Sequence, residues 1–286
     1  MFVFFRDLDR RWIFLAMFLA IAIPLLIGIR FPEEPSQMVR NVYQEIDQLE
    51  EGADILLAFD FDPASQGELQ PMAAAFTRHC ALKKHKLYFM TLWPTGVPMI
   101  EQNIRILTTE FPEYKYGTDY VNLGYKPGME VVIQSIVSEG NLQELFTTDN
   151  AGTSLKSHPM TEKLGDILKM NLIVNVSAGT PGAKEWVQYA ATPFNLNMVA
   201  GTTGVGAPAL YPYIPKQLRG ILGAIKAAAE YEQAMIEKFP DLKENKDAQE
   251  GLRRMGPQLV AHLLIIGLIV VGNIIFFVDR RRGTTS

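Results

Sequence analysis

The sequence predicts a three-layer α/β domain with a mainly parallel sheet, flanked by two transmembrane helices. Two apolar runs, Trp12 to Ile29 and Leu259 to Val278, lie near the two ends of the 286-residue chain. Each is about as long as a helix must be to cross a hydrocarbon core roughly 30 Å thick. Between them, short apolar runs alternate with segments whose apolar residues recur at helical spacing. This alternation is typical of a parallel sheet covered by helices.

In the first half of the domain, three predicted helices alternate with two predicted strands. The strands are short apolar runs, and the helices carry an apolar stripe. In chain order we expect a helix over residues 33–51, a strand over 54–60, a helix over 65–84, a strand over 86–92 and a helix over 97–111. Ser65 and Glu68 have the spacing of a capping box, which begins the second helix. Pro112 ends the third helix.

The second half continues the same alternation. In chain order we expect a short strand over 120–123, helices over 128–137 and 142–146, a strand over 171–176, a helix over 180–190, a strand over 197–201 and a long helix over 215–239. Thr180 and Pro181 are predicted to cap and open their helix. Residues 147–157 are rich in Thr, Ser, Asn and Gly, which predicts a mobile surface loop.

This order of elements predicts parallel strands joined by right-handed crossovers. The architecture resembles a Rossmann-type or flavodoxin-type fold, and a resemblance of architecture implies no function. We divide the chain into a cytoplasmic tail (1–11), a transmembrane helix (12–29), an extracytoplasmic α/β domain (30–240), a charged helical stalk (241–258), a second transmembrane helix (259–278) and a basic cytoplasmic tail (279–286).

Basic residues at the outer ends of the two apolar runs predict the orientation. They are Arg6, Arg10 and Arg11 before the first run, and Arg280, Arg281 and Arg282 after the second. Because basic residues favour the cytoplasmic side, both termini are expected in the cytoplasm and the domain outside it. A bacterial inner membrane with a periplasmic domain fits this arrangement.

A secretory signal peptide is the alternative interpretation of the first apolar run. We expect a retained anchor instead. The run is longer than a usual signal core, Pro24 lies within it, and no small-x-small cleavage pattern precedes Phe31.

Charge and cysteine content exclude two classes of protein. The chain has 27 Lys and Arg against 31 Asp and Glu, and six of the basic residues lie in the tails, so the domain is acidic. Nucleic-acid binding requires clustered Lys and Arg, and no nucleic-acid partner is expected. The single cysteine, Cys80, excludes an internal disulfide framework. The domain must therefore rely on its hydrophobic core.

Ligands of open α/β sheets usually bind beyond the carboxyl ends of the strands. The small polar residues expected there are Thr95, Ser177, Thr180, Gly201, Thr202 and Thr203. The two Gly/Thr turns, at 177–182 and 201–206, have backbone N–H groups that can hold an anion. The alternative is that their glycines serve tight turns, because neither segment completes a phosphate-binding motif.

Asp60 and Asp62 follow the first predicted strand as an Asp-x-Asp pair. This resembles the opening motif of haloacid-dehalogenase-type phosphatases, and the resemblance implies a nucleophile and an acid/base around a magnesium ion. The likeness ends there, because Pro63-Ala64-Ser65 follows where the family has a Thr or Ser and then a bulky apolar residue. The alternative role for both carboxylates is to cap the turn before the next helix.

Metal and cofactor binding are not expected. His79 and His85 straddle the end of a predicted helix, and His158 stands alone. No carboxylate lies at ligand spacing beside them, and no His accompanies a plausible Ser or Cys nucleophile.

Small and polar residues within the spans indicate helix packing. Ala16 and Ala20 are four residues apart in the first run, while His262 and Asn273 lie in the second. An amide in lipid normally finds a partner across a helix interface. In the predicted helix 215–239, the small residues Gly220, Ala224 and Ala228 fit close packing on its own sheet or on a partner helix.

The leading functional hypothesis is an anchored, non-enzymatic structural, accessory or sensing subunit of a membrane complex. Its expected partners are the lipid bilayer and other membrane-protein subunits, or a second copy of itself. The alternatives are an extracytoplasmic module that binds a small ligand such as an anion, and a phosphatase-like hydrolase. The overall plan resembles, in layout alone, accessory proteins of some bacterial transport and gliding systems.

Overall fold

The computed structural model describes residues 9–28, 33–139, 142–163 and 167–281. The chain divides into two compact units, one formed by residues 33–251 and the other by the two terminal segments, 1–32 and 252–286. Within the first unit the described residues form one six-stranded sheet, in the order β3-β2-β1-β4-β5-β6. Every pairing in it is parallel, as the alternation of elements predicts.

The strands are short and almost wholly buried. Their bounds are β1 Asp54–Asp60, β2 Lys86–Thr91, β3 Tyr120–Tyr125, β4 Leu172–Ser177, β5 Met198–Thr202 and β6 Ile221–Gly223. Such continuous burial explains why the strands appear in the sequence as unbroken apolar runs, since a parallel sheet is covered on both faces. The prediction of an α/β fold with a parallel sheet is confirmed.

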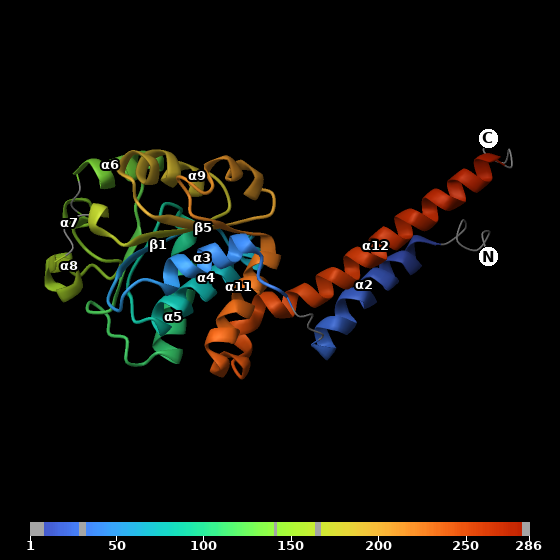
Figure 1. Ribbon diagram of the computed structural model, residues 1–286, viewed down its shortest axis with the longest axis horizontal. Helices are drawn as coiled ribbons and strands as arrows, with labels where there is room; N and C mark the ends of the chain where they lie inside the picture. Colours follow the sequence, from blue (N-terminus) through green and yellow to red (C-terminus); the bar gives the residue numbers. More distant parts are fainter. Residues whose placement is uncertain (1–8, 29–32, 140–141, 164–166, 282–286) are drawn as a thin grey trace. The chain divides into compact units, whose positions relative to one another are not determined.

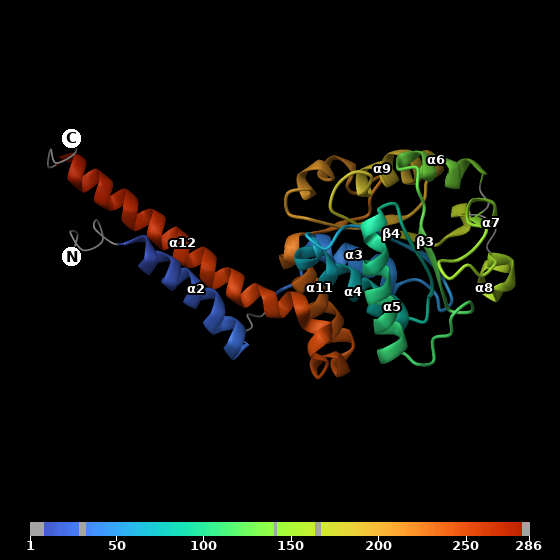
Figure 2. The same ribbon diagram turned by 180° about the vertical axis from the view of Figure 1, so that it is seen from behind.

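Helices cover both faces of the sheet. Figures 1 and 2 show α3, α4, α5 and α11 on one face and α6 and α9 on the other, so that the domain has three layers. The helices of this unit are α3 Gln37–Asp47, α4 Gln66–Leu82, α5 Val97–Glu110, α6 Glu130–Glu139, α7 Leu142–Leu145, α8 Pro159–Lys163, α9 Ala183–Trp186, α10 Thr192–Phe194 and α11 Ala224–Lys238. A core cluster that includes Leu56, Tyr88, Ile173 and Trp186 fills the space between the sheet and the α6–α9 layer.

The predicted long helix over residues 215–239 is wrong in its first third. Residues 221–223 form the edge strand β6, where Ile221 pairs with Ala200 and Leu222 with Gly201. The helix α11 begins only at Ala224. A Cβ atom at Gly220 would come within 2.8 Å of Val42, so this glycine allows the strand to approach α3 closely. The predicted small-residue series therefore does not lie on one helix.

Two predicted helix caps are also wrong. Ser65 makes no capping hydrogen bond, and the carboxylate of Glu68 instead accepts a bond from the backbone N–H of Gly204. The helix predicted to open at Thr180 begins at Ala183, with Gly182 as its N-cap. There the carboxylate of Glu185 accepts the N–H of Gly182 at 2.9 Å. A contact with the distant turn at Gly204 therefore replaces the predicted cap at Ser65. At the second helix, a capping bond to Gly182 replaces the predicted cap at Thr180.

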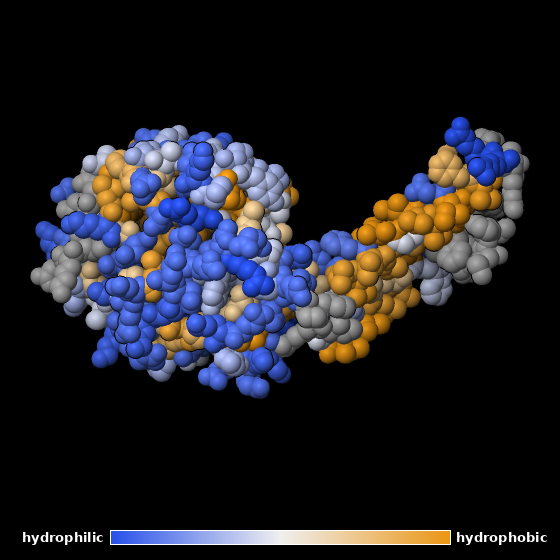
Figure 3. All heavy atoms as spheres, in the orientation of Figure 1, coloured by the Kyte–Doolittle hydropathy of each residue, from blue (hydrophilic) through white to orange (hydrophobic). Residues whose placement is uncertain are grey.

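The second unit contains two apolar helices. These are α2, Arg10–Ile27, and the outer part of α12, Glu250–Arg281. Both are long and apolar enough to cross a membrane by length and composition. Large apolar side chains on each helix are exposed, such as Phe14, Leu26, Leu263 and Ile266. Figure 3 shows the apolar residues along these helices and the largely polar surface of the domain on the face in view.

The four residues predicted to mediate packing in the spans lie on these helices. Ala16 and Ala20 are partly buried on α2, whereas His262 and Asn273 are exposed on α12. The amide nitrogen of Asn273 donates to the carbonyl oxygen of Ile269 at 2.8 Å, one helical turn earlier. The side-chain amide of Asn273 is therefore partly satisfied within its own helix. It needs a hydrogen-bond partner on a second helix less than the sequence indicates.

Candidate functional site

The carboxyl ends of β1, β2 and β4 meet at a buried carboxylate. Asp60, the last residue of β1, has no exposed surface. Its Oδ1 accepts the backbone N–H of Leu92 at 2.6 Å, and its Oδ2 accepts the amide of Asn175 at 2.7 Å. Two weaker bonds come from the Thr91 hydroxyl at 3.4 Å and the Trp186 indole at 3.3 Å. Asp60 therefore joins β1, β2, β4 and α9.

This environment opposes ionisation of Asp60 and denies it access to substrate. Burial raises the pKa of the Asp60 carboxyl to about 6, and the hydrogen bonds from Leu92, Asn175 and Trp186 keep it from rising further. A nucleophile must contact its substrate, and a side chain with no exposed surface makes no such contact in this conformation. The geometry gives Asp60 a structural role in the core.

Asp62 has the turn-capping geometry that was the alternative to catalysis. It is partly exposed, and its Oδ1 accepts the backbone N–H of Ser65 at 2.9 Å. This bond closes the turn that leads into α4, as short polar side chains commonly do.

Protein groups occupy the crevice beyond β2 and β4. The Trp93 indole donates to the carbonyl oxygen of Pro181 at 2.8 Å and joins the two loops. Ser177 is buried, and its hydroxyl accepts the N–H of Ala183 at 2.9 Å. Thr95 and Thr180 are exposed on these same loops. The structure brings the predicted residues to one edge of the sheet, where Ser177 is buried and bonded within the protein while Thr95 and Thr180 are exposed.

The turn after β5 is also internally satisfied. Gly201 and Thr202 are buried, and the Thr203 hydroxyl accepts the N–H of Gly206 at 3.1 Å. The N–H of Gly204 donates to the carboxylate of Glu68 at 2.9 Å. A carboxylate of the protein itself thus holds the place where an external anion would bind this turn.

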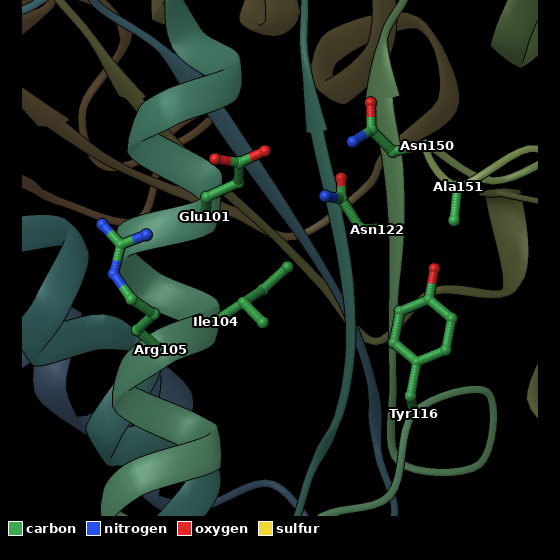
Figure 4. Close-up of a pocket in the computed structure, with 7 residues that line it drawn as sticks. All are labelled: Glu101, Ile104, Arg105, Tyr116, Asn122, Asn150 and Ala151. Carbon is green, nitrogen blue, oxygen red and sulfur yellow. The ribbon is translucent and has the colours of Figure 1, made fainter.

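A second polar site lies beside β3, which is the edge strand at the other end of the strand order from β6. It is a cleft of about 310 Å³ lined by α5, β3 and the loops that contain Tyr116 and Asn150. Figure 4 shows Glu101 and Ile104 of α5 facing Asn122 of β3, with Asn150 and Ala151 above the ring of Tyr116. Arg105 of α5 also lines the cleft, with its guanidinium drawn on the side of the helix away from Asn122.

Asp149 organises the loop that forms one wall of this cleft. Its Oδ2 accepts the hydroxyl of Tyr116 at 2.7 Å and lies 2.9 Å from the Nε2 of His158. Its Oδ1 accepts the backbone N–H groups of Ala151 and Thr153. Burial raises the pKa of Asp149, but these hydrogen bonds outweigh it and leave the pKa below its usual value. The predicted surface loop is therefore anchored by a buried carboxylate.

A β-bulge shapes the floor of the cleft. The pairing of β2 with β3 shifts register after Phe89, because Phe89 faces Asn122 and Met90 faces Gly124. Gly124 has φ +73°, and the Oδ1 of Asn122 accepts its N–H at 2.9 Å. A Cβ atom at this glycine would lie 2.7 Å from the side chain of Asn150. Bulges of this kind re-aim side chains next to binding sites.

Comparisons with protein-family models, with curated proteins and with solved structures found no match to this chain. The site is therefore interpreted from its own geometry.

His79 and His85 occupy core positions. His79 is buried, with its Nδ1 2.6 Å from the hydroxyl of Tyr231 and its Nε2 3.6 Å from Asp47. Burial lowers the pKa of both His79 and His85. Among the residues that the structure describes, no group of three His, Cys, Asp or Glu side chains is arranged to hold a metal ion.

Sequence reasoning missed the cleft beside β3. Its residues are spread between positions 101 and 151, and no local motif joins them. One signal was present: Asp149-Asn150-Ala151-Gly152 is a strong turn sequence, in which the Asp side chain bonds to backbone groups two and four residues later.

Proposed function

We propose that this protein is a two-pass membrane-anchored accessory or sensing subunit whose α/β domain is linked to both membrane segments through the single helix α11. The observation that carries the proposal is a pair of buried carboxylates on α11, Glu230 and Glu232. Each bonds to one of the two points at which the chain leaves the domain.

Glu230 anchors the segment that follows the first apolar helix. Its Oε2 accepts the backbone N–H of Ser36 at 2.9 Å, at the N-cap of α3. Its Oε1 pairs with Lys226 at 3.2 Å. A carboxylate at a helix N-terminus is favoured by the partial positive charge of the unpaired N–H groups there.

Glu232 anchors the start of the second apolar helix in the same way. Its Oε1 accepts the backbone N–H of Gly251 at 2.9 Å, in the first turn of α12. A Cβ atom at Gly251 would lie 2.9 Å from the backbone nitrogen of Ala229, so only glycine lets this turn pack directly on α11. Both exits of the chain from the domain are therefore bonded to α11.

The membrane location and orientation rest on composition. Supporting observations are the exposed apolar side chains of α2 and α12 and the basic residues Arg280 and Arg281 in the last turn of α12. By the positive-inside rule these features support cytoplasmic termini and a domain outside the cytoplasm, as in a bacterial inner membrane with a periplasmic domain. The apolar surfaces require lipid, other membrane subunits or a second copy of the chain.

The strand order of the sheet resembles that of Rossmann-type domains. This resemblance is compatible with a role in binding or scaffolding, but it identifies no ligand or partner. The strand order 3-2-1-4-5-6 is the one found in Rossmann-type domains, and its switch point falls between β1 and β4. At this switch point Asp60 bonds to Asn175 inside the core, and a fold alone does not define a ligand.

Membrane association and assembly test the proposal together. We expect the full chain to stay with the membrane after an alkaline carbonate wash, and to migrate above the monomer mass after gentle detergent extraction from its native membrane. Cross-linking before extraction should give the same larger species. Release of the chain by carbonate would contradict the proposed membrane anchor. A monomer with no co-purifying protein in either preparation would contradict the proposed accessory role.

A further inference from the structure

We propose that the cleft beside β3 is a binding site for a neutral polyhydroxy compound, a sugar or sugar alcohol, with the ring of Tyr116 as its stacking platform. The proposal concerns the domain alone and does not rest on its membrane location. At about 310 Å³ the cleft is at the small end of the range for small-molecule sites. One sugar ring is an occupant of suitable size.

The ring of Tyr116 is held rigidly while remaining accessible. It is 41% exposed, although its hydroxyl is fixed by Asp149. Tyr120 and His158 meet it edge to face, with ring centroids 5.3 and 5.4 Å away. Such fixation lowers the entropy lost on binding. A polarised C–H face of a sugar suits the electron-rich face of an aromatic ring.

Two amides next to this ring have unused hydrogen-bonding capacity. Asn122 is more than nine-tenths buried, and its Oδ1 is bonded to Gly124. Within the described ranges, its amide nitrogen and the side-chain amide of Asn150 have no protein partner. Figure 4 shows both amides at the cleft, facing the side where Glu101 lies. An amide both donates and accepts, which matches the dual capacity of a hydroxyl group.

The charges around the cleft disfavour an anion. The carboxylate of Glu101 faces the two amides and forms no ion pair with any residue that the structure describes. Arg105 also lines the cleft, but its guanidinium is drawn on the side of α5 away from Asn122 and Asn150. An anionic ligand placed at the two amides would meet the like charge of Glu101. A cation is the competing occupant, since it would attract Glu101 and the ring face of Tyr116. The two free amides favour the polyol.

The test measures binding to the full chain in lipid nanodiscs, which contain no sugar-based detergent. Glucose, galactose, mannose, N-acetylglucosamine and sorbitol are titrated separately, with choline and inorganic phosphate as contrasting probes. Saturation-transfer NMR and calorimetry report binding. We expect at least one polyol to bind saturably with a Kd of about 1 mM or tighter, and phosphate not to bind.

Variants separate the stacking role from structural effects. Tyr116→Phe and Tyr116→Ala both lose the bond to Asp149, but only Phe keeps the ring. We expect Phe to retain most of the affinity and Ala to lose about tenfold or more. Asn150→Ala, at an exposed position, should weaken binding severalfold. Thr109→Ala, exposed on α5 outside the cleft, should leave it unchanged.

Three outcomes would overturn the proposal. One is the absence of saturable binding by every polyol tested. Another is equal affinity in the wild type, Asn150→Ala and Tyr116→Ala. The third is binding of choline alone with loss in Glu101→Gln, which would assign the cleft to cations, because a neutral polyol should tolerate this substitution.

Discussion

Replacing Asp60 by Ala is expected to lower the free energy of unfolding by about 3 kcal/mol or more, because removing one partner from a buried charged network leaves the others unsatisfied. The donors that would lose their acceptor include the backbone N–H of Leu92 and the side chains of Asn175 and Trp186. Thermal or urea unfolding of the full chain in lipid nanodiscs measures the change.

Asp62→Ala is the matched control, since Asp62 is partly exposed and its side chain accepts the backbone N–H of Ser65 in a surface turn. We expect a loss of about 1 kcal/mol or less there, typical of one capping bond. If both variants lost the same stability, Asp60 would not be the structural centre of the strand ends.

Asp60 also predicts a dependence of stability on pH. Its pKa is raised from 3.8 to about 6 in the folded protein, so the folded state binds this proton more tightly than the unfolded state. The contribution of the Asp60 proton to stability is therefore fully present below about pH 4 and is lost as pH rises from about 4 through 6, by about 3 kcal/mol in total. Asp60→Asn, which does not titrate, should remove this component; an unchanged pH profile would contradict it.

Replacing both α11 carboxylates, in Glu230→Gln with Glu232→Gln, is expected to loosen both exits of the chain from the domain. A hydrogen bond to a charged group contributes about 1.5–3 kcal/mol, so the double variant should weaken the two attachments by several kcal/mol in sum. Hydrogen exchange should become faster at residues 35–40 and 248–251, while the strands β1 and β4 keep their protection.

Glu237→Gln is the matched control on the same helix. Glu237 is exposed, and its carboxylate accepts a long hydrogen bond from Gln233 at 3.4 Å. We expect its exchange pattern to equal that of the wild type. If exchange at the two exits were also unchanged in the double variant, α11 would not link them and the proposed coupling would fail.

The parts of the fold that depend on local pattern were predictable. Residues 54–60 form β1 with the bounds that the apolar run indicates. Parallel strands buried on both faces leave this signal because almost every side chain must be apolar. Helices with a clear stripe and a proline stop, such as α5, were placed equally well.

The errors arose where a distant partner decides the local structure. Residues 221–223 have good helix formers on both sides, and their strand conformation depends on pairing with β5. Ala224, with φ +63°, marks the change from strand to helix, and no local sequence preference predicts it. Tertiary contacts override intrinsic propensity at such positions.

The candidate site was predicted at the carboxyl ends of the strands, where Asp60 and Ser177 are buried and bonded within the protein and Thr95 and Thr180 are exposed. Sequence spacing correctly brought Asp60 and Ser177 together, but burial and bonding partners depend on the packed structure. The cleft beside β3 requires a bulge at Gly124 and a buried Asp149, and both are products of three-dimensional packing.

The side of the membrane on which the domain lies tests the central claim most directly. Cys80, the single cysteine, is fully buried, and burial raises the pKa of its thiol, so it should not react with maleimides. A cysteine is introduced at Thr109 in the domain or at Thr285 in the tail, and sealed bacterial spheroplasts are treated with a membrane-impermeant maleimide. We expect labelling at position 109 in intact spheroplasts and at 285 only after permeabilisation. Labelling of both positions, or of neither, before permeabilisation would contradict the account.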